Sequence, residues 1–217
     1  MKKKLLAALI LGITVLPALQ GCFPVVAAGV TTGVLAVVDR RSVGTQTEDE
    51  TIEWKARARV GEKLKNNTHF NFTSYNRRVL ISGEVPSAEV KAEAERIVAA
   101  IPNVQGVYNE LVVGPVSSFS ERSNDSFITS KVKSRFVDAG KFNPMHVKVV
   151  TEAGTVFLLG LVTQAEANSA VQVARTTSGV KKVVNLIEII TPAKARELDV
   201  AQKGSGNAPP PAPVEQR

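Results

Sequence analysis

Cysteine and histidine are scarce: the 217 residues include one Cys and two His. A single cysteine cannot form an intramolecular disulfide, so a disulfide framework is excluded. Structural zinc sites usually take four Cys or His ligands, so we expect no metal site, and we expect no cofactor. Charged residues make up 22% of the chain and hydrophobic residues 44%. This is close to the usual globular mix and excludes a wholly disordered chain.

The first long apolar run is too short for a membrane span. Residues 5–16 are apolar and follow Met1 and three lysines, whereas a transmembrane helix needs about 20 apolar residues. A basic start followed by a short apolar run is typical of a secretory signal. We therefore predict that residues 1–21 are a signal peptide.

The signal ends in Leu19-Gln20-Gly21-Cys22, which resembles a bacterial lipobox. The resemblance implies cleavage before Cys22, diacylglycerol on its sulfur and an acyl chain on the new amino group. Two or more acyl chains make a stable membrane anchor. Phe23, in place of Asp at the next position, implies the outer membrane by analogy with lipoprotein sorting in enteric bacteria. The alternative is an ordinary free cysteine behind a cleaved signal.

A lipidated linker is predicted over residues 22–46. Its part from 23 to 38 is apolar and rich in small residues, so it either packs against the folded domains or lies at the membrane interface. Loss of the signal would leave 24 Lys and Arg against 20 Asp and Glu. This mild excess is unlike the basic stripe of a nucleic-acid binder, so we expect no nucleic-acid partner.

An internal repeat organises the rest of the chain. Residues 79–85 align with 156–162, and residues 103–109 align with 179–185. Each unit reads as helix, strand, strand, helix and strand. The expected helices are 51–65 and 87–100 in the first unit, then 125–139, with Asp125 and Ser126 as caps, and 164–177 in the second. The final strands are expected over 104–113 and 180–190.

Gly83 and Gly160 each follow an apolar strand and precede a Val-x-x-Val-x-Asn strand by about 20 residues. This arrangement resembles the BON domain. The resemblance implies an α+β fold of two tandem α-β-β-α-β BON domains, each a small three-stranded sheet packed by two helices. We place them at residues 47–115 and 120–192. Residues 193–217 form a C-terminal extension that is expected to be disordered from about 204, because four prolines follow that point.

Catalytic signals are weak. His69 and His146 have no Ser or Cys partner at a motif spacing, so both are expected to be structural. The acidic residues 48–50 precede the first helix and would favour the positive end of its dipole. We therefore predict that the protein is not an enzyme.

The opening helix of the second unit carries the most informative pattern. At about 100° per residue, Ile128, Val132 and Phe136 form the core stripe and Phe127 lies on the opposite side. Three further residues flank it: Lys131, Ser134 and Arg135. An exposed aromatic ringed by cations is the pattern of shallow insertion into an anionic membrane. The alternative is that Phe127 packs against the first domain.

Two BON domains behind a lipobox resemble the dual-BON outer-membrane lipoprotein family. That resemblance implies a lipid-anchored, periplasm-facing protein. It would bind anionic phospholipids such as phosphatidylglycerol or cardiolipin through the second domain, with Phe127 inserting where the family usually has Trp. It also implies concentration at the division site and support of envelope integrity.

Trp54 occupies a position in the first helix like that of Phe127 in the second, away from its core stripe. The first unit has an excess of one acidic residue over basic ones, so a domain or protein contact is expected there. The rival interpretation is accordingly a protein-interaction adaptor. It would contact the outer-membrane assembly machinery or envelope-remodelling factors through the first domain.

Overall fold

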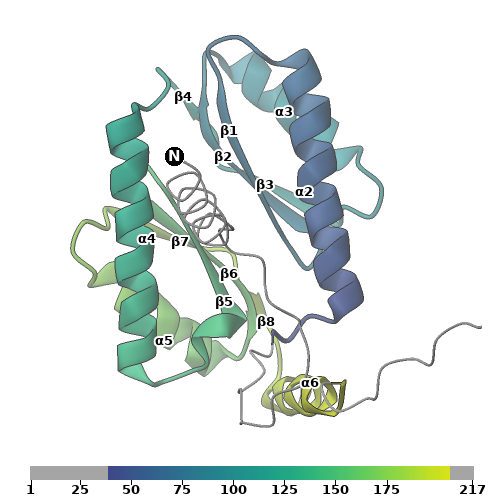
Figure 1. Cartoon of the computed structure of the whole chain (residues 1–217), viewed down its shortest axis with the longest axis vertical. Coiled ribbons are helices and arrows are strands. Elements are labelled where there is room, and N and C mark those ends of the chain that lie inside the picture. Colours follow the sequence, from purple (N-terminus) through teal and green to yellow (C-terminus); the bar gives the residue numbers. More distant parts are fainter. Residues whose placement is uncertain (1–38, 206–217) are drawn as a thin grey trace, which may run out of the picture. The chain divides into compact units, whose positions relative to one another are not determined.

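The structure is a computed structural model that describes residues 39–205 (Figure 1). The predicted signal, Cys22 and the end of the C-terminal extension lie outside the described residues. The first repeat contains the elements α2 (Val43–Lys63), β1 (His69–Tyr75), β2 (Arg78–Val85), α3 (Ala88–Ala99), β3 (Gly106–Asn109) and β4 (Val112–Val113). None of the helices within residues 39–205 is long and apolar enough to cross a bilayer.

The second repeat has the same order of elements. It contains α4 (Phe119–Ala139), a 3-10 turn η2 (Pro144–His146), β5 (Val147–Glu152), β6 (Thr155–Val162), α5 (Gln164–Arg175), β7 (Lys182–Asn185) and β8 (Glu188–Ile189). A further helix, α6 (Pro192–Ser205), follows it. We had not predicted α6, because its sequence carries no strong apolar stripe.

Each repeat forms a small mixed sheet, as the α+β prediction requires. The second strand is central: β2 pairs antiparallel with β1 and parallel with both β3 and β4. The same pattern joins β6 to β5, β7 and β8. The two predicted final strands were therefore wrong in detail, because each is interrupted. In the first repeat the interruption turns Leu111 into the core, where 2% of it is exposed.

Helices cover one face of each sheet (Figure 1). In α2 the buried stripe is Ile52, Ala56 and Val60, and the equivalent stripe of α4 is Ile128, Val132 and Phe136. These stripes agree with the helical period read from the sequence. They pack on the alternate residues of the central strands that point toward the helices, such as Val79 and Ile81 in β2.

The other faces of the two sheets share a separate apolar cluster. Tyr75 and Leu80 of the first repeat pack there with Phe157, Leu159 and Leu161 of the second. Polar pairs flank this cluster: Lys148 Nζ lies 3.1 Å from Glu53 Oε1, and Arg78 Nε lies 3.4 Å from Glu188 Oε2. The two repeats are therefore joined by apolar packing with ion pairs around it.

A buried aspartate in each opening helix holds the hairpin turn of its own sheet. Asp125, 5% exposed, accepts hydrogen bonds from the backbone N–H groups of Ala153 and Gly154, both at 2.8 Å. Asp49 accepts the equivalent bonds from Asn76 and Arg77, at 2.8 and 2.7 Å. The four turn residues all have positive φ, which matches a two-residue type I′ hairpin. The carboxylates stabilise turns whose non-glycine residues would otherwise disfavour that conformation.

The predicted start of the second opening helix was wrong. Asp125 is inside α4, which begins at Phe119 with Ser118 as its N-cap. Ser118 and Glu121 form a capping box, with the Ser118 hydroxyl accepting from the Glu121 N–H and the Glu121 carboxylate accepting in return. The first opening helix likewise begins at Val43, eight residues before the predicted start.

Two arginines before α2 tie the ends of the described chain together. Arg40, 4% exposed, donates to Glu166 of α5 and to Asp199 of α6 at 2.8 to 3.1 Å. Arg41 Nη1 donates to Asp49 Oδ2 at 2.7 Å, and its guanidinium stacks 3.9 Å above the Tyr75 ring centroid. The bonds from Arg40 hold the pKa of Asp199 below its usual value. These contacts explain why α6 is docked despite its weak apolar pattern.

Replacing Asp125 with alanine should lower the free energy of unfolding by about 2–3 kcal/mol, because the buried Gly154 N–H and the part-buried Ala153 N–H lose a charged acceptor. Urea unfolding followed by circular dichroism measures the change. Asp138→Ala is the matched control, since Asp138 is exposed on the same helix. Equal losses in the two variants would contradict the role of Asp125.

Candidate functional site

Helix α4 leaves three large apolar side chains in solvent. Phe119 is 80% exposed, Phe127 is 61% exposed and Val137 is 66% exposed. At about 100° per residue they fall within an arc of about 80°, on the side opposite the buried stripe. The exposed serines of the same arc are Ser123, Ser130 and Ser134. These six residues are called the α4 face below.

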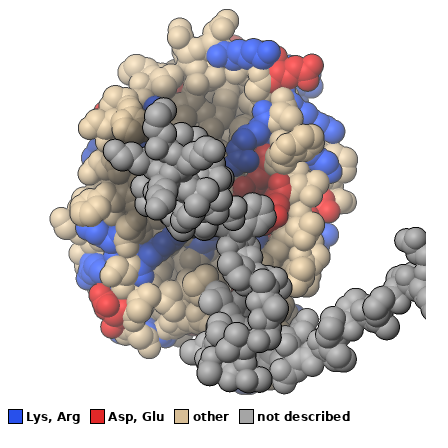
Figure 2. Space-filling view, viewed as in Figure 1, with Lys and Arg blue, Asp and Glu red and all other residues tan. Residues whose placement is uncertain are grey.

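The α4 face contains no charged residue and runs for about 27 Å, at about 1.5 Å per residue. Figure 2 shows mostly uncharged atoms on the side where α4 lies, at the left, with Lys and Arg gathered toward the lower end of the helix. Because Phe127 is 61% exposed, it is not packed against the first repeat. The alternative of an interdomain contact for Phe127 is therefore wrong.

The predicted cations differ in what they contact. Lys131 Nζ lies 4.8 Å from the centroid of the Phe127 ring and donates to the Ser178 carbonyl at 2.6 Å. Arg135 Nη1 instead donates to the Val173 carbonyl at 3.2 Å and to Thr177 Oγ1 at 3.0 Å. These acceptors lie at the end of α5, so Arg135 is held on that helix end, where a cation is favourable.

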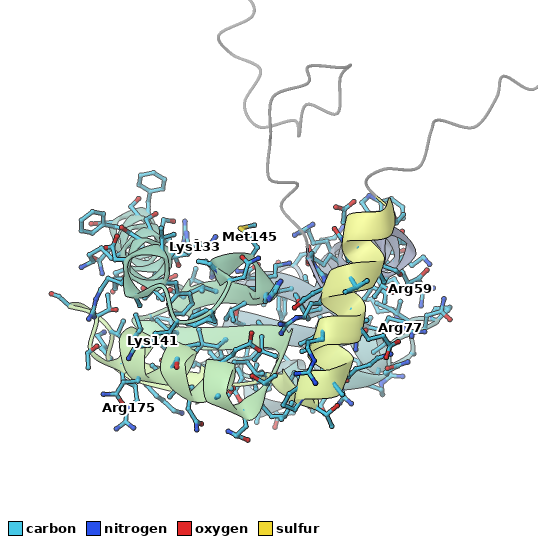
Figure 3. The ribbon with its side chains drawn as sticks, turned by 90° about the horizontal axis from the view of Figure 1, so that it is seen from below. Arg59, Arg77, Lys133, Lys141, Met145 and Arg175 are labelled. Carbon is cyan, nitrogen blue, oxygen red and sulfur yellow. The ribbon has the colours of Figure 1, made fainter. Side chains whose placement is uncertain are left out.

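Sequence reasoning missed Phe119, Val137 and Lys133. Lys133 is exposed beside the α4 face, and Met145 of the contacting turn η2 is 51% exposed. Figure 3 shows Lys133 beside α4 and Met145 next to it, on the same side of the molecule. Phe119 was missed because the helix was started too late; the Ser118-x-x-Glu121 capping pattern was the signal for its true start.

Trp54 on α2 is the large aromatic most exposed in the first repeat among the described residues, at 68%. The adjacent acidic residue, Glu53, does not face outward with it. Its carboxylate accepts from the Ser74 N–H at 2.9 Å and pairs with Lys148 of the second repeat. The exposed acidic neighbour of Trp54 is therefore Glu50, one helical turn before it, and not Glu53.

A second polar group of residues lies where the sheets meet. His69 Nδ1 is 3.1 Å from Glu84 Oε2 and 3.6 Å from Glu152 Oε1. Both carboxylates are more than nine-tenths buried. Burial raises the pKa of the Glu152 carboxyl, and the Glu84 charge acts in the same direction while His69 opposes it. Sequence patterns did not predict this group, because its members are distant along the chain.

The BON-domain family matches two stretches of the chain, residues 48–115 and 124–191. The outer membrane lipoprotein DolP of Haemophilus influenzae is 42% identical over 84% of this chain and 95% of its own length. A 21 kDa hemolysin of Actinobacillus pleuropneumoniae is 35% identical over 70% of this chain and 80% of its own length. Among solved structures, CdsD of the Chlamydia trachomatis type III secretion system shares 14% identity over 72% of this chain and 98% of that chain. The TM-score between the two structures is 0.29.

The two matched stretches coincide with the two repeats of the structure, and each contains one of the glycines used to recognise the repeat in the sequence. Gly83 and Gly160 lie on the central strands, where an added Cβ would come within 2.1 Å of the His69 carbonyl oxygen and 2.5 Å of the His146 carbonyl oxygen. Only glycine fits such an approach between paired strands. The two matched stretches and the similarity over most of the chain show that this protein belongs to the BON-domain family, in the group that includes the outer membrane lipoprotein DolP.

Proposed function

We propose that this protein is an outer-membrane lipoprotein that faces the periplasm and binds anionic phospholipids through the α4 face. Cys22 would carry the lipid anchor. The observation that carries the proposal is the uncharged α4 face with two exposed phenylalanines and flanking lysines. Concentration at the division site and support of the envelope barrier are the cellular roles we infer from the family resemblance. No chemical step is proposed, since BON-domain lipoproteins are not known as enzymes.

The energetics favour weak, reversible contact. Burying a phenylalanine side chain contributes about 1.5–3 kcal/mol, and each Lys or Arg near an anionic surface contributes about 1 kcal/mol. Phe119, Phe127 and Lys133 together would therefore give a modest affinity. A modest affinity is sufficient when an acyl anchor already holds the protein at the membrane, because the second contact is then intramolecular.

Changing Phe127 to glutamate should reduce binding to anionic vesicles at least tenfold, because it places a negative charge in the centre of the α4 face. Co-sedimentation of residues 23–217 with phosphatidylglycerol or cardiolipin vesicles measures the binding. Zwitterionic vesicles and high salt should both weaken it. Trp54→Glu is the matched control, since it puts the same charge on an exposed aromatic of the equivalent helix. Unchanged binding by Phe127→Glu would overturn the proposed site.

Variants of Lys133 and Arg135, which lie on opposite sides of the α4 face, should distinguish a loss of lipid binding from a loss of stability. Lys133→Gln should weaken binding to anionic vesicles about fivefold, the equivalent of about 1 kcal/mol. Arg135→Gln should mainly lower the urea midpoint of unfolding, because it breaks the bonds to Val173 and Thr177. Vesicle sedimentation and urea unfolding of both variants test this. A larger binding loss for Arg135→Gln than for Lys133→Gln would assign the headgroup contact to Arg135.

A second function rests on Trp54. An aromatic that is 68% exposed on a helix is typical of the anchor residue of a protein interface. We propose that the first BON domain contacts a protein partner here, with the outer-membrane assembly machinery as the candidate. A photo-reactive amino acid at position 54 should then crosslink to protein in cells, whereas the same probe at position 127 should crosslink to lipid. Protein adducts at 127 and none at 54 would reverse the two assignments.

A further inference from the structure

His69, Glu84 and Glu152 bring one imidazole nitrogen and two carboxylates together between the sheets. The three potential ligand atoms all lie within 4.8 Å of one another. His69 and Glu84 belong to paired strands of the first repeat, β1 and β2, where they face each other in register. Glu152 ends β5 of the second repeat. The group is therefore completed only when the two BON domains are in contact.

Two of the three distances between the potential ligand atoms are close to those around a bound metal ion. Two ligands of a tetrahedral zinc, each about 2.1 Å from the ion, are about 3.4 Å apart. His69 Nδ1 lies 3.1 and 3.6 Å from the two carboxylate oxygens, on either side of that value. Three protein ligands leave a fourth position for water, which is a common arrangement for zinc with nitrogen and oxygen ligands.

Lys181 and Lys182 line the same cavity as the two carboxylates, but within residues 39–205 neither lysine forms an ion pair with them. Within residues 39–205, the ion pairs of Glu84 and Glu152 are to His69 alone. Asp125 lies near Glu152 and adds negative charge. Arg122, which lines the neighbouring hollow, uses its guanidinium to donate to the Ser117 carbonyl. Two buried carboxylates therefore share one imidazole, and buried carboxylates are ordinarily paired or coordinate a metal.

Hydroxyl groups orient both carboxylates from outside the cluster. Ser82 Oγ donates to Glu152 Oε2 at 3.2 Å. The Ser117 N–H and hydroxyl donate at 3.3 and 3.2 Å to Glu84 Oε2, the oxygen that also faces His69. The Ser82 bond leaves Glu152 Oε1, the oxygen nearer His69, available for another partner. Such outer hydrogen bonds are the usual support of metal ligands.

An ion could reach the cluster from solvent. One cavity of about 760 Å³ is lined by both glutamates together with the β4–α4 connection. A second, of about 410 Å³, is lined by His69 and Glu152. The three side chains therefore line two cavities that are open to solvent. The His69 side chain itself is 24% exposed.

We propose that His69, Glu84 and Glu152 form a divalent-cation site of the zinc class that joins the two BON domains. Imidazole with carboxylate oxygens suits zinc and related transition-metal ions. The bound ion would neutralise the two carboxylates and add a link between β1, β2 and β5. This departs from our expectation of no metal site, which rested on the scarcity of cysteine and histidine.

The test is a zinc titration of the EDTA-treated full chain in detergent, followed by calorimetry and by thermal unfolding. One equivalent of zinc should bind, and saturation should raise the unfolding midpoint by several degrees because the ion binds the native state. His69→Gln and Glu152→Gln should each weaken zinc binding at least tenfold. Both replacements keep side-chain size, and circular dichroism would verify that the variants fold.

Two matched controls separate this site from ordinary zinc adsorption. His146→Gln removes the other histidine of the chain, and Glu188→Gln removes another carboxylate at the contact between the repeats. Both should retain the affinity of the parent protein. Absence of stoichiometric zinc binding, or equal losses in His69→Gln and His146→Gln, would overturn the proposal.

Discussion

A carboxylate buried beneath a hairpin turn is the constraint on which each BON domain depends. Asp49 and Asp125 are 76 positions apart, the spacing of the repeat, and each accepts the two N–H groups of a turn with positive φ. This contact fixes the opening helix against the central strand. In both repeats the aspartate lies inside the helix, which begins six residues before it, at Val43 or at Phe119.

The central elements could be predicted from the sequence because their signals are periodic and repeated. The stripes Ile52/Ala56/Val60 and Ile128/Val132/Phe136, together with Gly83 and Gly160, were sufficient to give the order of elements. Helix starts were missed, since Asp125 looks like a cap when only neighbouring residues are considered. Helix α6 was missed for a different reason: its position depends on the ion pair between Asp199 and Arg40, 159 residues apart.

In the candidate site, too, features set by neighbouring residues could be predicted from the sequence, and features set by tertiary contacts could not. The outward direction of Phe127 follows from helical period alone. The difference between Lys133, which is exposed, and Arg135, which is held by Val173 and Thr177, depends on where α5 ends in space. The group of His69, Glu84 and Glu152 could not be found from spacing, because two sheets must meet before its members are neighbours.

The fixed position of Arg40 has a consequence for how the protein could move at a membrane. Arg40 is buried in bonds to α5 and α6, so the folded part begins at a defined point immediately after Asp39. If Cys22 carries the anchor, the 17 residues from there to Asp39 can extend over no more than about 60 Å. The tether would then keep Asp39 within that distance of the lipid surface, and the α4 face within that distance plus the span of the folded part. The α4 face would then meet lipid when the tethered protein rotates toward the surface. Diffusion of the protein to the membrane would not be needed.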